Sequence, residues 1–391
     1  MAKFMRWVTL KGRCHLPRVK AQQHIGLVGA GNVPLIHRNE HHAVAVHGLR
    51  TQIGFIELPK TRLDILPTSP LGMDEGLPPR IPFLPDKVLH HPAGCVVTGM
   101  EGELLWLDLS LHPVGDVSVP IPMRVHQATV NDQAFQGMWL DRELLLAFMA
   151  SLPLDSQTNG VRRADLRTSI NTTTSHHPAG NLWSHSLDAE PMALAGQGQI
   201  LVFELYRRGL YSISTNAEER WRMASPTWQY SKRRPRNEET VALHIVNDEI
   251  FMTSKGGHVQ RRSLETGQLL EEFVLSGVEG PVEHHYRNGV NELVATARGD
   301  VFWLKSGEIM HHVRLSGPVQ FAVWDERFRG WRIAGWREEA WLGPHLCDRR
   351  ETREIPIHIH PIGNGALLLF NDGSWENSAF ESLPLRGAEE E

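Results

Sequence analysis

The feature that most constrains this sequence is a unit of several short strands that recurs along the chain. Apolar or alternating runs of a few residues are separated by turns rich in Gly, Asn and Asp, and the clearest unit spans residues 241–275. The second strands of successive units begin near Ile250, Leu293, Ile333 and Leu367. A four-stranded meander that repeats about every 40 residues is typical of a β-propeller blade.

Helical periodicity is almost absent, so the sequence predicts an all-β protein. We expect residues 1–391 to form a single closed β-propeller of seven or eight four-stranded blades, with an early unit at 43–58. The last unit lacks a fourth strand, and the alternating stretch Phe4–Leu10 at the N-terminus would complete it. Closing the ring in this way removes the exposed sheet edges that promote aggregation.

Several segments interrupt the repeat. Residues 66–82 are rich in Pro and Gly, and residues 151–190 are polar, so both are predicted to be insertions over the ring. Residues 231–237 form a basic loop, and the acidic C-terminus 386–391 is expected to be disordered.

The stretch from Lys255 to Phe273 resembles a blade of the WD40-like and quinoprotein-like propellers. It contains a Gly turn, a β run, the turn Glu265-Thr-Gly and a final strand. The resemblance is clearest over 240–375 and implies the fold only. The Trp-Asp ending of WD40 repeats and the cofactor-docking pattern of quinoprotein dehydrogenases are missing, so no cofactor is implied.

Composition excludes several classes of protein. Hydrophobic residues make up 41% and charged residues 22%, the balance of a chain that folds. A net charge of −5 does not favour nucleic-acid binding, and no apolar run is long enough to span a membrane. The three cysteines have no CxxC spacing, and no signal peptide is recognisable at the N-terminus, so we expect a cytoplasmic protein.

The sequence contains 22 histidines, many in doublets, and several precede a Pro-x-Gly turn at the end of a first strand. First strands line the channel of a propeller, so these side chains are candidates for ligand binding at its mouth. The candidates are His90, His91, His284, His285, His358 and His360. A ring of histidines there would bind a metal or an anion, or would become charged near pH 6. The alternative is that the turn was copied by duplication and its imidazoles bond to the backbone.

Only His358 and His360, two apart on one strand, have chelating spacing, so we predict neither a metal centre nor a cofactor. The sequence has no GxSxG motif, and no cysteine lies near a recognisable base, so we predict a protein that is not an enzyme. Aromatic and Arg side chains are typical of interfaces. The candidate partner contacts are Trp183, Trp228, Arg233, Arg234 and Arg236.

These observations favour a non-catalytic scaffold that mediates protein–protein interactions in a cytoplasmic, prokaryotic multiprotein assembly. Its partners would be one or more proteins, without nucleic acid or membrane. Two alternatives are left open. One is a His-rich propeller that binds a ligand or acts as a metal-dependent hydrolase. The other is a component of a prokaryotic defence or stress-response system that acts with an ATPase or a protease.

Overall fold

The computed structural model describes residues 76–155, 158–169, 175–229, 237–344, 347–363 and 365–380, all within the unit 57–391. These residues form strands and one short helix, which confirms the all-β class. The helix, α1 (Arg163–Ser169), has 7 residues. Within the described ranges, no helix is long and apolar enough to cross a membrane.

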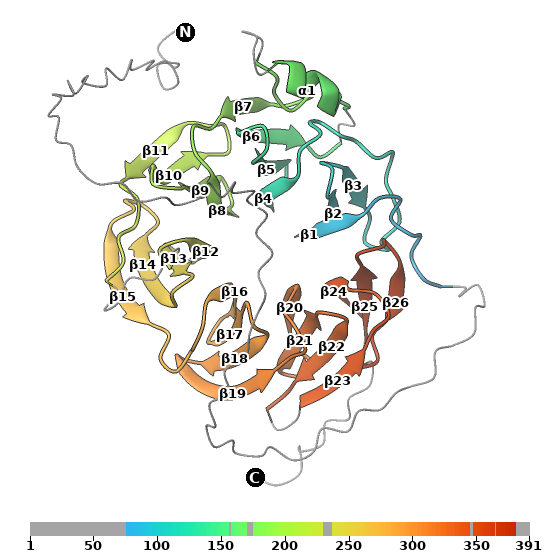
Figure 1. The fold of residues 1–391 in the computed structure, drawn as a ribbon, viewed down its shortest axis with the longest axis vertical. Helices are drawn as coiled ribbons and strands as arrows, with labels where there is room; N and C mark the ends of the chain where they lie inside the picture. The colour runs from blue at the N-terminus through green and yellow to red at the C-terminus, as the bar shows by residue number, and fades with distance from the viewer. Residues whose placement is uncertain are drawn as a thin grey trace, which may run out of the picture. The chain divides into compact units, whose positions relative to one another are not determined.

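Strands that follow one another in sequence pair antiparallel and form seven sheets, called blades 1 to 7 in chain order (Figure 1). Blade 1 contains β1 (Pro85–His91), β2 (Gly94–Gly99) and β3 (Leu104–Leu107). Blade 2 contains β4 (Val125–Val130), β5 (Ala134–Asp141), β6 (Leu146–Pro153) and β7 (Trp183–Ser186). Blade 3 contains β8 (Pro191–Gln197), β9 (Ile200–Leu205), β10 (Gly209–Ser214) and β11 (Glu219–Met223). Blade 4 contains β12 (Thr240–Val246), β13 (Glu249–Ser254), β14 (His258–Ser263) and β15 (Leu269–Val274). Blade 5 contains β16 (Val282–Asn288), β17 (Asn291–Thr296), β18 (Asp300–Lys305) and β19 (Glu308–Arg314). Blade 6 contains β20 (Phe321–Asp325), β21 (Gly330–Gly335), β22 (Glu338–Leu342) and β23 (Cys347–Glu351). Blade 7 contains β24 (Pro356–Ile362), β25 (Gly365–Phe370) and β26 (Trp375–Asn377).

The first strand of each blade contacts the first strands of its two neighbours, from β1 through β4, β8, β12, β16, β20 and β24 and back to β1 (Figure 1). The ring therefore closes between blades 7 and 1, and the described residues form seven blades, the lower of the two expected counts. The early unit 43–58 and the strand Phe4–Leu10 lie outside the described residues. Blades 1 and 7 have three strands each, and isolated bridges from Leu104 to Ser118 and from Leu107 to Pro113 extend the outer edge of blade 1.

The apolar core of the described chain is divided among the junctions between blades. Seven clusters of buried side chains occur, and each combines residues of two adjacent blades. Trp303 of blade 5 packs with Trp331 of blade 6, for example, and Val88 of blade 1 packs with Leu369 of blade 7. Because every junction is filled by close-packed side chains, the ring holds its blades at fixed positions.

A β-bulge recurs near the start of the first strand in six of the seven blades. The residues that follow it are Lys87, Gln127, Ala193, Ala242, His284 and His358. The shared irregularity is consistent with duplication of one unit. The side chain at this position varies among Lys, Gln, Ala and His, so the blades do not all present the same chemical group at this place.

The expected insertions can be located in part. The connection between β6 and β7 carries α1, and the predicted range 151–190 also includes the end of β6 and the whole of β7. Blade 2 therefore depends on strand residues at both ends of that range. Residues 66–75, 231–236 and 386–391 lie outside the described residues.

Candidate functional site

Three of the six candidate histidines lie together where the ring closes. His90 is the penultimate residue of β1, whereas His358 and His360 lie two apart on β24. Alternate residues of a strand share a face, so both β24 side chains point the same way. One nitrogen of each ring lies within 4.8 Å of the corresponding nitrogens of the other two rings. This group is called the seam histidines below.

The rings of the seam histidines contact one another closely. The centroid of His90 lies 5.0 Å from that of His358 and 5.3 Å from that of His360, and the two β24 rings are 6.3 Å apart. Phe321 of β20 lies against His358, with ring centroids separated by 4.3 Å. Burial increases from His90, which is exposed, through His360 to His358, which is 1% exposed.

Several nitrogens of this group have no hydrogen-bond partner within the described part of the chain. They are Nδ1 and Nε2 of His358 and Nδ1 of His360. Buried polar atoms in proteins are nearly always paired, because leaving one unpaired costs about 1–3 kcal/mol. These three nitrogens are therefore candidates for bonding to a ligand.

The local environment keeps these imidazoles neutral. Burial, followed by the charges of His90 and His360, lowers the pKa of His358 well below its ordinary value of 6.5. Burial and the neighbouring His90 lower the pKa of His360 to about 4, and burial also lowers the pKa of His90. Neutral imidazole is the form that coordinates metal ions.

The other three candidate histidines do not join the seam histidines. His91 turns to Trp106, with ring centroids 5.2 Å apart, and its Nδ1 accepts a hydrogen bond from the backbone N–H of Ala93. His284 lies in blade 5 and stacks on Tyr286. The buried His285 uses both ring nitrogens for other contacts.

Their separation follows from where the structure places them within their strands. His284 directly follows the bulge of β16, near its start, whereas its place in the repeat predicts a position at the strand end. The similar doublet His176-His177 lies in the connection before β7, so it does not follow a first strand as the pattern predicts. There His177 Nδ1 is 3.1 Å from the Ser184 hydroxyl.

The candidate partner-contact tryptophans bond within the ring. Trp183 of β7 donates from Nε1 to the carbonyl of Thr215, at 2.7 Å, and so links blades 2 and 3. Trp228 donates from Nε1 to the carbonyl of Glu238, at 3.1 Å. Both are half-buried and pack against apolar clusters. Arg233, Arg234 and Arg236 lie outside the described residues.

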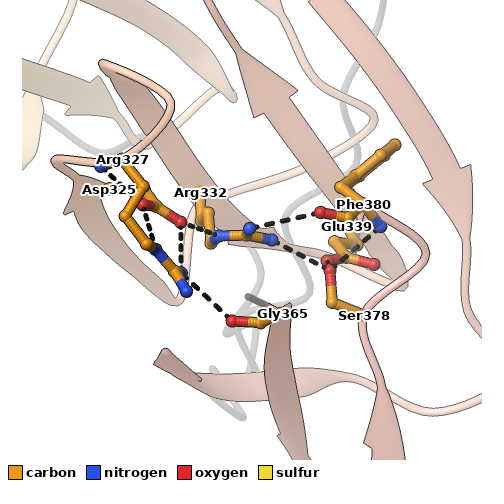
Figure 2. A network of polar contacts seen from close by, with 7 residues as sticks. All are labelled: Asp325, Arg327, Arg332, Glu339, Gly365, Ser378 and Phe380. Carbon is orange, nitrogen blue, oxygen red and sulfur yellow. Dashed lines mark hydrogen bonds and ion pairs between the residues drawn. The ribbon is translucent and has the colours of Figure 1, made fainter. Parts of the chain in front are cut away.

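A second polar cluster lies at the junction of blades 6 and 7, centred on the fully buried Arg332 (Figure 2). Its Nε donates to Asp325, at 2.7 Å, and its two terminal nitrogens donate to the Ser378 hydroxyl and to the carbonyl of Phe380. The Ser378 hydroxyl in turn donates to Glu339. All three guanidinium nitrogens are thus paired within the protein, so this cluster is a structural network.

A polar cavity that the sequence did not predict lies among the first strands of blades 2 to 5. Its volume is about 600 Å³, and its lining includes His126, Arg142, Lys255, Glu283 and His284. Arg142 pairs with Glu190, and Lys255 lies 3.8 Å from Glu239, so the charges are largely balanced by the protein itself. Of these five residues, His284 is among the candidates that the sequence singled out, whereas the others come from separate blades and share no motif, which leaves no local signal for them in the sequence.

The described cysteines are unsuited to nucleophilic catalysis. Burial, with a contribution from Asp108, raises the pKa of Cys95 to about 12, and burial raises that of Cys347 to about 11. The thiolate is the reactive form of cysteine, so both thiols are inert at neutral pH.

No family model and no curated protein matches this chain. Among solved structures, it is similar to BamB from Moraxella catarrhalis, with 12% identity and a TM-score of 0.46, over 74% of this chain and 82% of that chain. It is also similar to the computationally designed Ika8 protein, with 11% identity and a TM-score of 0.50, over 77% of this chain and 98% of that chain. Such low identities concern the fold alone. The seven blades themselves confirm the predicted propeller resemblance at the level of the fold.

Proposed function

We propose that the protein is a non-catalytic scaffold of a cytoplasmic multiprotein assembly and that it binds partner proteins on a preformed surface. The observation that supports this proposal is the way in which the connection between β6 and β7 is fastened to the ring. A surface held in place before binding loses little conformational entropy when a partner docks, which favours affinity.

Backbone and side-chain contacts fasten this connection at both ends. The N–H of Gly160 donates to the carbonyl of Val119, at 2.9 Å, and the N–H of Ala179 donates to the carbonyl of Pro120, at 2.8 Å. In α1, Leu166 is fully buried in the apolar cluster between blades 1 and 2. The connection is therefore part of the packed ring.

Three arginines lie along α1 and at the residue before it, and each pairs with a nearby carboxylate. Arg163 is held at 2.7 Å from the buried Asp141, whereas Arg162 pairs with Asp165 and Arg167 pairs with Glu143 through side chains that are 85% and 55% exposed. Arg binds carboxylates through two parallel hydrogen bonds, so the partner that fits this surface presents an acidic patch.

The test compares two double variants of the tagged full-length chain expressed in its source cells. Arg162→Glu with Arg167→Glu reverses the charge of α1, and Arg298→Glu with Arg353→Glu makes the same change at exposed positions of blades 5 and 6. We expect the first to reduce recovery of co-purifying proteins at least tenfold and the second to leave it unchanged. Equal recovery with both variants would contradict a docking role for α1.

Charge reversal is preferable to deleting residues 151–190. That deletion would remove β7 and part of β6, and with them the outer half of blade 2. A lost interaction would then report misfolding of the blade.

A second candidate function, ligand binding by a histidine-rich propeller, is favoured by the unpartnered nitrogens of the seam histidines. Hydrolysis is less well supported, because a hydrolytic metal site usually works with a carboxylate base or orienting group. The group of potential ligands in the described chain contains three histidines and no carboxylate.

A further inference from the structure

We propose that His90, His358 and His360 bind one transition-metal ion of the zinc class, and that this ion ties blade 1 to blade 7. The proposal deepens the second candidate function, ligand binding, and does not depend on the scaffold role. It rests on the geometry of the three rings, on their unpaired nitrogens and on their position at the closure of the ring.

The spacing of the nitrogens is close to what a tetrahedral ion requires. Zn–N bonds of about 2.1 Å place ligand nitrogens about 3.4 Å apart, whereas here they lie within 4.8 Å of one another. His358 is enclosed by protein, whereas His90 is exposed and contacts the other two rings from the solvent side. Small rotations of the three rings, with little change in the backbone, would bring their nitrogens into bonding range.

Direct contact among the rings gives an incomplete account of the site. Stacked and tilted imidazoles pack well, and His90 against His360, at 5.3 Å, is such a pair. Packing alone leaves both nitrogens of His358 and Nδ1 of His360 buried without partners. A metal ion would pair one nitrogen on each ring and so remove part of this cost.

The ligand set determines the class of metal. Three neutral imidazoles suit zinc, copper, nickel or cobalt, whereas calcium and magnesium require oxygen ligands. Three protein ligands leave a fourth position open on the exposed side of His90, where water completes the coordination. In most metal sites, the histidine nitrogen that does not bind the metal donates a hydrogen bond that fixes the ring. The unpaired nitrogens here have no such acceptor in the described chain, so we expect the affinity for the metal to be weaker than at those sites.

The position of the site at the closure of the ring gives the metal a structural role. His90 belongs to the first blade, and His358 and His360 belong to the last. Elsewhere at this junction, the N–H of Ile81 donates to the carbonyl of Gly373, at 2.9 Å, and Arg80 pairs with Asp372, at 3.1 Å. A bound ion would add coordinate bonds between the two ends of the ring.

The first experiment measures metal binding with Zn²⁺ and Co²⁺ alone, added to the full-length metal-free protein. Stoichiometry is measured by native mass spectrometry, and Co²⁺ coordination is followed by its visible absorption. We expect one ion per chain and an absorption spectrum typical of tetrahedral nitrogen ligation. No stoichiometric ion, or an octahedral spectrum, would overturn the metal site and with it the ligand-binding candidate, and would leave the scaffold proposal intact.

Two neighbouring residues provide a matched pair of variants. His90→Gln removes an exposed ligand and should raise the Kd more than 100-fold, a larger effect than outer-shell changes cause. His91→Gln alters the adjacent ring, which contacts Trp106, and should leave the Kd unchanged. His358→Ala risks unfolding because His358 is buried, so His360→Gln serves as the second test. Equal losses in His90→Gln and His91→Gln would mean that the ion binds elsewhere.

Hydrogen exchange with and without Zn²⁺ tests the structural role separately. We expect slower exchange in β1 and β24, with little change in β9, β13 and β17, and a midpoint of thermal unfolding about 4 °C higher at 100 times the Kd. Stoichiometric binding with uniform or no protection would retain the metal site and overturn its role in closing the ring.

Discussion

Blade 7 meets its two neighbours through very different polar contacts. At its junction with blade 6, Arg332 is buried and every guanidinium nitrogen has a partner (Figure 2). At its junction with blade 1, His358 is equally buried, and neither of its ring nitrogens has a partner within the described residues. Both junctions also contain an apolar cluster, so the difference lies in the polar groups.

The comparison separates two reasons for burying a polar side chain. The Arg332 network joins residues 378–380 and the carboxylates of Asp325 and Glu339 into one hydrogen-bonded unit. Although burial acts to raise the pKa of Asp325, hydrogen bonds from Arg327 and Arg332 hold it below its ordinary value. The seam histidines have no such compensation from the protein. A site of this kind is stable only if packing outweighs the cost or a ligand supplies the missing bonds.

The largest effect is expected from Arg332→Leu. Removing the guanidinium takes one charged hydrogen bond from the buried Asp325 and leaves the Ser378 hydroxyl and the Phe380 carbonyl without their donor, so the free energy of unfolding should fall by about 3–5 kcal/mol. Urea denaturation measures this loss. Arg327→Gln is the control, because Arg327 also bonds to Asp325 but is 34% exposed, and its effect should be below about 1.5 kcal/mol. Equal losses of stability in the two variants would mean that Arg327 holds the network together as much as Arg332 does.

A third buried polar group sharpens the comparison by its dependence on pH. Glu204 of β9 is 4% exposed, and burial raises its pKa from 4.5 to about 7, an effect that the charge of Arg262 partly opposes. The folded state therefore binds a proton that the unfolded state releases. The stabilisation is complete below about pH 4.5 and is lost as the pH rises towards 7.

In Glu204→Gln this pH dependence should disappear. Between pH 4.5 and pH 8, the free energy of unfolding of the natural chain should fall by about 3 kcal/mol relative to the variant. Urea denaturation at several pH values measures the difference. Glu279→Gln, at an exposed position, is the control and should leave the pH dependence of the natural chain unchanged. A constant difference between the natural chain and Glu204→Gln would show that Glu204 is ionised in the folded protein.

The strand pattern could be predicted where hydrophobic alternation and turn residues agree. In blade 4 the expected strands match β12 to β15 to within a residue or two. β7 and β8 could not be predicted, because the half-buried residues of β7 follow a long polar connection and resemble it in composition. Burial of β7 depends on its pairing with β6, which is a property of the assembled blade.

The histidine site was only partly predictable for a similar reason. The spacing of His358 and His360 indicates chelation by itself, because strand geometry is local. The approach of His90 depends on the number of blades, because seven blades bring β1 beside β24. The repeat pattern predicts an equivalent position for His284 and His285, but they lie in blade 5. For Arg332, the sequence signal is a charged residue inside an otherwise apolar strand. Its partners could not be predicted, because they come from distant segments of the chain.

The smallest expected effect is also the sharpest contrast with Arg332. Replacing His358 by Leu exchanges an imidazole with two unpaired nitrogens for an apolar side chain of similar volume. In the metal-free protein, this change should leave the free energy of unfolding unchanged or raise it by up to about 1 kcal/mol, because no hydrogen bond is lost. The same variant should no longer gain stability from Zn²⁺, whereas the natural chain should. Urea denaturation with and without Zn²⁺ measures both effects, and a loss of 3 kcal/mol or more without metal would show that His358 has a role in the fold comparable to that of Arg332.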